Sequence, residues 1–210
     1  MQRKISDAVI RRLPRYYRQL LALESEGVQK ISSLALSTLM NVTASQIRQD
    51  LNCFGGFGQQ GYGYNVSELR RHIAQILGLD RKYSMVIIGA GNIGQALSSY
   101  TQFASEGYDI LALFDTNPEL IGRSIGNADV LPMDGLESFL TGRTVDIAVV
   151  AVPAKAATSV AQRLVRAGIQ AIWNFAPVEI VIDGVVVENA QLTDGLMTLT
   201  YKLGTLKSGD

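Results

Sequence analysis

The sequence predicts an α/β protein built from a small helical domain with a wing, a parallel-sheet domain and a C-terminal helix. Short helical patterns and a glycine-rich segment fill residues 1–82, and apolar strands alternate with amphipathic helices over residues 83–190. A glycine fingerprint follows the first of those strands, and residues 191–210 repeat leucine at helical spacing. We therefore expect three parts, with boundaries near residues 82 and 190.

Composition and charge narrow the function classes. Of the 210 residues, 47% are hydrophobic and 18% are charged, which excludes a disordered or collagen-like chain. The net charge is zero, but residues 1–82 carry 12 Lys and Arg against 6 Asp and Glu, whereas residues 83–210 carry 7 against 13. This asymmetry indicates a basic module that meets a polyanion, joined to a domain with another task.

The sequence also lacks features that several other classes of protein require. Cys53 is the single cysteine, so an intrachain disulfide and a CxxC zinc or redox site are impossible. The first residues lack the apolar core of a signal peptide, and the longest uncharged apolar run, 147–154, is too short to span a membrane. We expect a cytoplasmic protein with no metal and no membrane partner.

The first helical pattern runs from Ile5 to Leu23 and places apolar residues on one face. Pro14 inside it either starts a helix at its first turn or kinks one. The other face carries arginines, and three of them are expected to neutralise DNA phosphates: Arg11, Arg12 and Arg15.

A helix-turn-helix pattern follows. Residues 33–40 predict a short helix with a serine cap, and Asn41-Val42 a tight turn. Thr43 with Gln46 three residues later forms a capping box, so a second helix begins there and runs through Leu51. We expect its exposed side chains to donate to phosphates and base edges: Ser45, Gln46, Arg48 and Gln49.

The glycine-rich segment from Phe54 to Tyr64 predicts a hairpin, and a further helix is expected over 66–77. Helices combined with such a hairpin make a winged helix, whose tip would contact DNA through Gln59, Gln60, Gly61 and Tyr62. The alternative is a solvated helix face on a small all-α bundle. The positive charge and the hairpin favour DNA.

Residues 83–190 alternate between strand and helix patterns. Strands are expected over 85–88, 109–114, 145–152, 169–173 and 178–187, and helices from the glycine loop to about 106, over 136–140 and over 156–167. Apolar strands without polar alternation indicate a parallel sheet that is covered on both faces. The tail from Leu192 to Leu206 is expected to form one amphipathic helix.

The glycine fingerprint has the most specific chemistry. Its six residues follow a strand and open a helix: Gly89, Ala90, Gly91, Asn92, Ile93 and Gly94. In a dinucleotide-binding Rossmann turn, Gly89 makes the turn, Gly91 admits a pyrophosphate and Gly94 allows close packing. Asp115 ends the next strand, where an acid binds ribose hydroxyls and favours NAD(H) over NADP(H). The alternative is a tight turn without a ligand.

Catalytic groups are scarce. His72 is the only histidine and is far in sequence from the glycine loop, and no Tyr-x-x-x-Lys pair exists. Cys53 is expected to be a small buried residue. We therefore predict that the nucleotide is read and not used, so the protein is not an enzyme. Two alternatives stay open: an NAD-dependent dehydrogenase, and a regulator that senses CoA or another nucleotide.

Segments along nearly the whole chain resemble the Rex family of redox-sensing transcriptional repressors. They are RRLPRYYRQL (11–20), TASQIRQDLNCFGGFGQQGYGYN (43–65), VIIGAGNIGQAL (86–97), FDTNPELIG (114–122), AVPA (151–154) and IWNFAPV (172–178). The resemblance implies a homodimer with a swapped C-terminal helix. Such a dimer binds double-stranded operator DNA and releases it when NADH binds in place of NAD⁺.

The resemblance also assigns residues. It places five near the nicotinamide, Val152, Pro153, Asn174, Phe175 and Ala176, and Leu192 in the nicotinamide pocket of the partner subunit. It implies a redox-linked switch of Arg18, Tyr100 and Gln191. The family usually has an acid where Gln191 stands, so a Gln191–Arg18 contact is a neutral–cation hydrogen bond. Many relatives have Lys at Gln49 and a basic residue at Gln60, which implies a shallower salt dependence of DNA binding.

Overall fold

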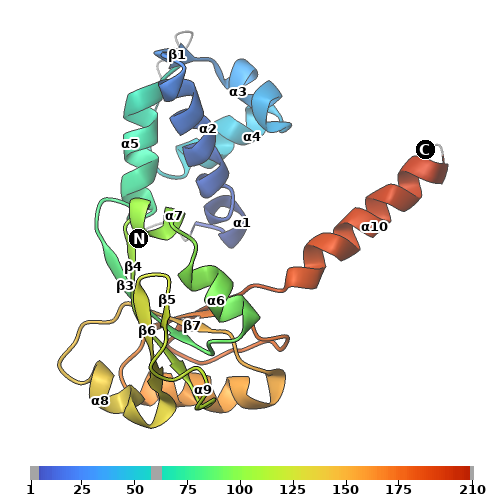
Figure 1. Cartoon of the computed structure of the whole chain (residues 1–210). Helices are drawn as coiled ribbons and strands as arrows, with labels where there is room; N and C mark the ends of the chain where they lie inside the picture. Colours follow the sequence, from blue (N-terminus) through green and yellow to red (C-terminus); the bar gives the residue numbers. More distant parts are fainter. Residues whose placement is uncertain (1–4, 58–62, 209–210) are drawn as a thin grey trace. The chain divides into compact units, whose positions relative to one another are not determined.

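The computed structural model describes residues 5–57 and 63–208, and the chain forms two compact units, residues 1–81 and 82–210 (Figure 1). The first unit contains five helices and two short strands in its described residues. They are α1 (Asp7–Ile10), α2 (Leu13–Ser25), β1 (Lys30–Ile31), α3 (Ser33–Met40), α4 (Ala44–Asn52), β2 (Tyr64–Asn65) and α5 (Val66–Ile76).

Helix boundaries in the first unit follow local signals. Pro14 stands in the first turn of α2 and so starts that helix instead of kinking it. The side chains of Ser32, Thr43 and Asn65 each accept a backbone N–H at the start of α3, α4 and α5. Asn41 takes the left-handed conformation between α3 and α4, with φ of 53°. The predicted helix-turn-helix is confirmed.

The core of the first unit joins α2 to the helix pair. Tyr16 and Leu20 of α2 are fully buried, as are Ile47 of α4 and Val66 and Ile73 of α5. This packing fixes one face of α4 against α2 and α5, while the other face of α4 is exposed to solvent.

The wing differs in one respect from the predicted hairpin. β2 pairs antiparallel with β1, which lies between α2 and α3, and residues 54–57 form no strand. The proposed tip residues Gln59, Gln60, Gly61 and Tyr62 lie outside the described residues.

The second unit is a doubly wound α/β fold. Its elements are β3 (Tyr83–Ile88), α6 (Asn92–Ser98), α7 (Gln102–Ser105), β4 (Tyr108–Asp115), β5 (Ser124–Ile125), β6 (Ala128–Pro132), a 3-10 turn η1 (Met133–Gly135), α8 (Leu136–Leu140), β7 (Ile147–Val150), α9 (Ala154–Arg166), β8 (Ala171–Asn174), β9 (Val186–Asn189) and α10 (Leu192–Ser208). The strand order is β5-β6-β4-β3-β7-β8-β9, and β5 alone pairs antiparallel. The chain order reverses between β3 and β7, where such folds bind ligands.

The two faces of this sheet are covered unequally. α8 and α9 bury Leu136 and Leu164 against one face, and Figure 1 shows both helices on that side. On the other face, Leu97 of α6 packs over Ile87 and Leu113. Val186 of β9 is 74% exposed. The expectation of a sheet covered throughout on both faces is therefore wrong at this edge.

Three element predictions need correction. The helix expected to run to about residue 106 breaks into α6 and α7, because the chain turns at Ser98, whose hydroxyl donates to Ile125 O. The strand expected over 178–187 is reduced to β9. At Ile180 the backbone bonds to a side chain instead of a neighbouring strand, since Asn189 both donates to and accepts from it. β5 and β6 were not expected at all.

The C-terminal leucine repeat forms the predicted helix, α10, in which large apolar side chains face solvent. Leu192, Leu196 and Leu199 are 64%, 61% and 60% exposed, and Leu203 is 48% exposed. None of the helices in residues 5–57 and 63–208 is both long enough and apolar enough to cross a membrane.

A substitution at Leu164 tests which face of α9 packs against the sheet. Leu164→Ala removes a fully buried side chain and is expected to lower the free energy of unfolding by about 2–5 kcal/mol. Val181→Ala, at a position 79% exposed, is the control and is expected to change it by less than about 0.5 kcal/mol. Chemical denaturation measures both, and equal losses would contradict this packing.

Candidate dinucleotide site and nucleic-acid interface

The turn between β3 and α6 depends on two glycines. Gly89 has φ of 101°, and a Cβ there would collide with Ala151 O. A Cβ on Gly94 would collide with Gly89 O. The end of β3, the start of α6 and the end of β7 therefore meet closely, and the predicted roles of Gly89 and Gly94 in turn and packing are met.

Gly91 is different, because its position is open. A Cβ built there has no atom within 4 Å, and Gly91 and Asn92 are exposed at the start of α6. Ala90 is fully buried and Ile93 is half-buried, so both side chains pack on the protein side of the turn. The first N–H groups of a helix lack acceptors within it. The opening beside Gly91 can therefore admit an anionic group to that helix end.

Asp115 ends β4 beside this turn, as predicted. Its Oδ2 accepts a hydrogen bond from Ala90 N at 2.6 Å, and its Oδ1 accepts one from Asn117 N at 2.8 Å. The carboxylate thus lies at the rim of the glycine loop, half-buried. A carboxylate has further lone pairs for hydroxyl donors.

The segment after β7 forms the opposite rim. Ala151 N donates to Ile88 O at 2.8 Å, and a Cβ on Gly89 would lie 3.1 Å from Cγ1 of Val152. Val152 is half-buried, and Pro153 is exposed as the residue before α9. These two residues do lie next to the glycine loop.

The segment after β8 contains the other three residues assigned to the nicotinamide side, and two of them are buried. Asn174 is 0% exposed, and its Nδ2 donates to Val178 O and to Asn189 Oδ1. Its Oδ1 accepts from Ala176 N, and Ala176 is 1% exposed. Both side chains are buried in the core, so they shape the loop and leave only Phe175 half-exposed there.

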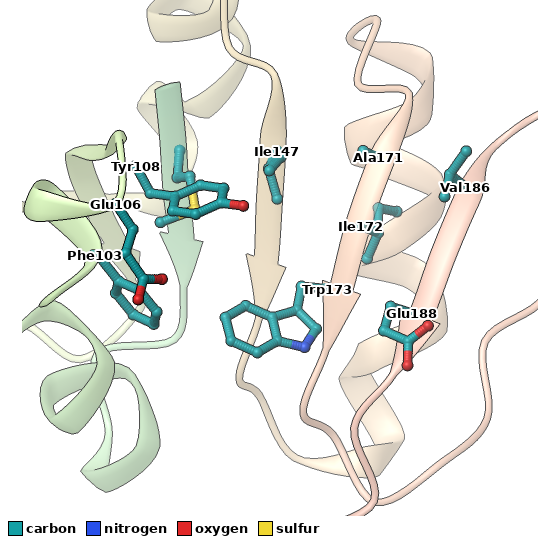
Figure 2. A pocket seen from close by; sticks show the side chains of 10 residues that line it. Phe103, Glu106, Tyr108, Ile147, Ala171, Ile172, Trp173, Val186 and Glu188 are labelled. Carbon is teal, nitrogen blue, oxygen red and sulfur yellow. The ribbon is translucent and has the colours of Figure 1, made fainter. Parts of the chain in front are cut away.

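Aromatic rings continue from Phe175 across the open face of the sheet. Its ring centroid lies 4.5 Å from that of Trp173, which lies 6.0 Å from Phe103, which lies 5.0 Å from Tyr100. Figure 2 shows Trp173 and Phe103 on the wall of a groove of about 390 Å³. The sequence analysis did not predict this groove. The one feature of the sequence that could have indicated it is Trp173, an aromatic residue on a short strand.

The predicted recognition helix α4 presents three of its four assigned residues to solvent. Ser45, Arg48 and Gln49 are exposed, and Nη1 of Arg48 donates to Ser33 Oγ at 3.0 Å. Gln46 is only half-buried instead of exposed, because its Nε2 donates to Oδ1 of Asp50 at 2.7 Å.

The arginines before α4 are not equivalent. Arg11 is exposed and forms an ion pair with Asp7, and Arg15 is exposed and donates to Met40 O. Arg12 instead forms an ion pair with the buried Asp50, with 28% of its side chain exposed. Its charge is therefore paired within the protein, and its expected contact with a DNA phosphate stays a prediction.

The three predicted switch residues are divided between the units. Arg18 is exposed in the first unit, whereas Tyr100 and Gln191 belong to the second. Tyr100 is 51% exposed, and its hydroxyl donates to Oε1 of Gln102 at 2.6 Å. The contact of Gln191 with Arg18 stays a prediction, as does the entry of the exposed Leu192 into a partner's pocket.

Two further reactive side chains, Cys53 and His72, belong to the first unit. Cys53 is exposed and its Sγ donates to Gln49 O, so the expectation that it is buried is wrong. His72 is half-buried beside Phe57, with ring centroids 5.3 Å apart. Among the described residues, no three His, Cys, Asp or Glu side chains gather as a metal site would require.

Two family models match this chain. One, described as "Putative DNA-binding protein N-terminus", covers residues 4–52, and the other, "CoA binding domain", covers residues 80–178. The boundary between these matches falls between α4 and β3. Each therefore matches one of the two units.

The similar proteins agree with both matches. The "Redox-sensing transcriptional repressor Rex" of Thermoanaerobacter pseudethanolicus is 52% identical over 95% of this chain and 90% of its own. The crystal structure of RSP in complex with beta-NAD+ and operator DNA has a TM-score of 0.91 and 51% identity, over 97% of this chain and 94% of that one. The crystal structure of RSP in complex with beta-NADH has a TM-score of 0.89 and 48% sequence identity, over 97% of this chain and 96% of that one. Identity of this extent shows the family: this chain belongs to the Rex redox-sensing transcriptional repressors.

Proposed function

We propose that this protein is a repressor that binds operator DNA in the cytoplasm as a homodimer and releases it when NADH replaces NAD⁺. The observation that carries the proposal is the open position at Gly91 with Asp115 on its rim, in a chain that also holds a helix-turn-helix. Relatives described with NAD⁺, NADH and operator DNA support it.

The residues present fit a dinucleotide. The opening at Gly91 takes the pyrophosphate at the start of α6, and the Asp115 carboxylate takes ribose hydroxyls. Val152 and Pro153 form the next part of the wall, and Phe175 faces the nicotinamide. Asn174 and Ala176 hold Phe175 in place from the core.

The apolar wall supplies the discrimination between the two redox states. The nicotinamide ring carries a positive charge in NAD⁺ and none in NADH. Desolvating a cation against Val152 and Phe175 costs free energy that a neutral ring does not lose. A difference of about 1.4 kcal/mol already gives tenfold discrimination. The ligands then shift the dimer between arrangements through this differential affinity.

The exposed residues of the first unit contact the DNA. Ser45, Arg48 and Gln49 project from α4 toward base edges and phosphates, and Arg11 and Arg15 neutralise phosphates. The predicted minor-groove contacts of Gln59, Gln60, Gly61 and Tyr62 fall outside the described residues and stay a prediction. A dimer places two such helices on successive major-groove faces, about one helical turn apart.

The chain has no catalytic part in this proposal, and the nucleotide is sensed. The match to a CoA-binding model keeps CoA as the alternative ligand, since CoA also carries a pyrophosphate. The ribose-binding role of Asp115 favours NAD(H). Calorimetric titration with NADH, NAD⁺ and CoA separates the two ligands.

The central test is linkage between ligand and DNA. Duplexes are first selected by the protein from a library with about 20 randomised base pairs, the length of two helical turns. NADH is expected to lower affinity for the selected duplex at fixed NAD⁺, and the duplex is expected to weaken NADH binding by the same factor. Equal DNA affinity with NADH and with NAD⁺ would overturn the proposal.

Gly91→Ala tests the nucleotide site without disturbing the fold. The added methyl enters the opening, so NADH affinity is expected to fall at least about tenfold (1.4 kcal/mol) while the thermal midpoint stays unchanged. Gly135→Ala is the control, because that position is equally open and belongs to η1, outside the glycine fingerprint. Fluorescence of Trp173, the only tryptophan, reports NADH binding beside Phe175. Unchanged NADH affinity of Gly91→Ala would place the ligand elsewhere.

Leu199→Glu tests the homodimer. Leu192, Leu196, Leu199 and Leu203 recur on one face of α10 and remain exposed in a single chain. A charge in that row is expected to convert dimers into monomers, as measured by light scattering at micromolar concentration. Thr198→Glu, on a neighbouring face of α10, is expected to leave the dimer intact. A dimer that survives Leu199→Glu would exclude α10 as the contact.

A further inference from the structure

A buried carboxylate in the first unit has no part in the function described so far. Asp50 of α4 is 1% exposed. Its Oδ2 accepts hydrogen bonds from Nε of Arg12 at 2.6 Å and from the hydroxyl of Tyr16 at 2.8 Å. Its Oδ1 accepts from Nη2 of Arg12 at 2.8 Å and from Nε2 of Gln46 at 2.7 Å. These four donors fill the acceptor capacity of a carboxylate.

This cluster keeps its charge at neutral pH. Burial works to raise the pKa of Asp50, but hydrogen bonds from Arg12, Tyr16 and Gln46 lower it below its ordinary value. Burial first, and then the bond to Asp50, raise the pKa of the Tyr16 hydroxyl, which therefore stays protonated as a donor. All four hydrogen bonds to the carboxylate are thus retained.

The bonds fix one helix against another. Arg12 precedes the first residue of α2 and Tyr16 lies one turn further on, whereas Gln46 and Asp50 are one turn apart on α4. The guanidinium binds the carboxylate through two parallel bonds, which fix direction as well as distance. Rotation of α4 about its own axis would break them.

The same carboxylate fixes the amide of Gln46. Rotation about the last side-chain bond of a free glutamine exchanges its oxygen and nitrogen. In this chain Nε2 must face Asp50, which leaves Oε1 and the second N–H as one acceptor and one donor. A glutamine edge of that kind pairs with N6 and N7 of adenine in the major groove.

We propose that Asp50 is a positioning residue for sequence reading: it orients α4 and the Gln46 amide so that the helix distinguishes base pairs. This inference rests on the proposed DNA-binding function. Asp50 acts on selectivity between DNA sequences through Gln46 and the orientation of α4, whereas its pairing with the charge of Arg12 affects the phosphates of every duplex alike.

Asp50→Asn in the full chain is the test, since it preserves size and removes the charge and half of the acceptors. The probes are the duplex selected by the wild-type protein and a scrambled duplex of equal length. The ratio of their affinities is expected to fall about tenfold or more. The charge of Arg12 that the substitution releases acts on the phosphates of both duplexes alike, so it cancels in this ratio. Tyr16→Phe removes one donor and is expected to give a smaller loss in the same direction.

Glu24→Gln is the matched control. Glu24 of α2 forms an ion pair with Arg70 of α5, so this variant breaks an interhelical ion pair without touching α4. It is expected to change the affinity ratio less than about twofold. If Glu24→Gln lowers the ratio as much as Asp50→Asn, the effect is one of general stability and the inference is wrong.

A double-mutant cycle with Gln46→Ala tests the route through the glutamine. If Asp50 acts through Gln46, then Asp50→Asn has little further effect on selectivity once Gln46 is removed. Additive losses would overturn the route through Gln46, and unchanged selectivity of Asp50→Asn would overturn the whole inference. A wild-type protein that selects no sequence at all overturns the proposed function instead, so the two failures are distinguishable.

Discussion

Close backbone approach at the end of β3 is the constraint on which the second unit depends. A side chain on Gly89 would strike Ala151 O, and one on Gly94 would strike Gly89 O. Two strands and a helix can therefore meet at the point where the strand order reverses. That junction excludes side chains at Gly89 and Gly94 but leaves space beside Gly91, with Asp115 hydrogen-bonded to the same loop.

Local signals predicted the elements that local interactions determine. Pro14 starts α2, Thr43 caps α4, and the glycine turn and Asp115 stand where the pattern placed them. The misses involve partners distant in sequence. β6 ends in Pro132 and contains Asp129, so it has weak strand propensity and exists because β4 pairs with it. The segment before β9 is extended and apolar, but Asn189 takes its hydrogen bonds.

The residue types in the sequence indicated which segments form the candidate site, but they did not indicate which of its side chains are buried. A motif shows that Asn174 and Ala176 belong to the nucleotide end of the sheet, but their contacts inside the core decide that they support the wall. Arg12 shows the same limit. Its sequence neighbours are arginines that face solvent, whereas its carboxylate partner lies 38 residues further along the chain. No periodicity within α2 contains that information.

The rings beyond Phe175 explain how a change of one charge can act at a distance. Phe175, Trp173 and Phe103 are in successive ring contact along the open face of the sheet. Phe103 in turn touches Tyr100, the residue that the family resemblance assigns to the switch. If a nicotinamide lies against Phe175 as proposed, we expect a shift of that ring to act on the row that ends at α7. The direction of that response depends on which of the two redox states the apolar wall accepts at lower free energy.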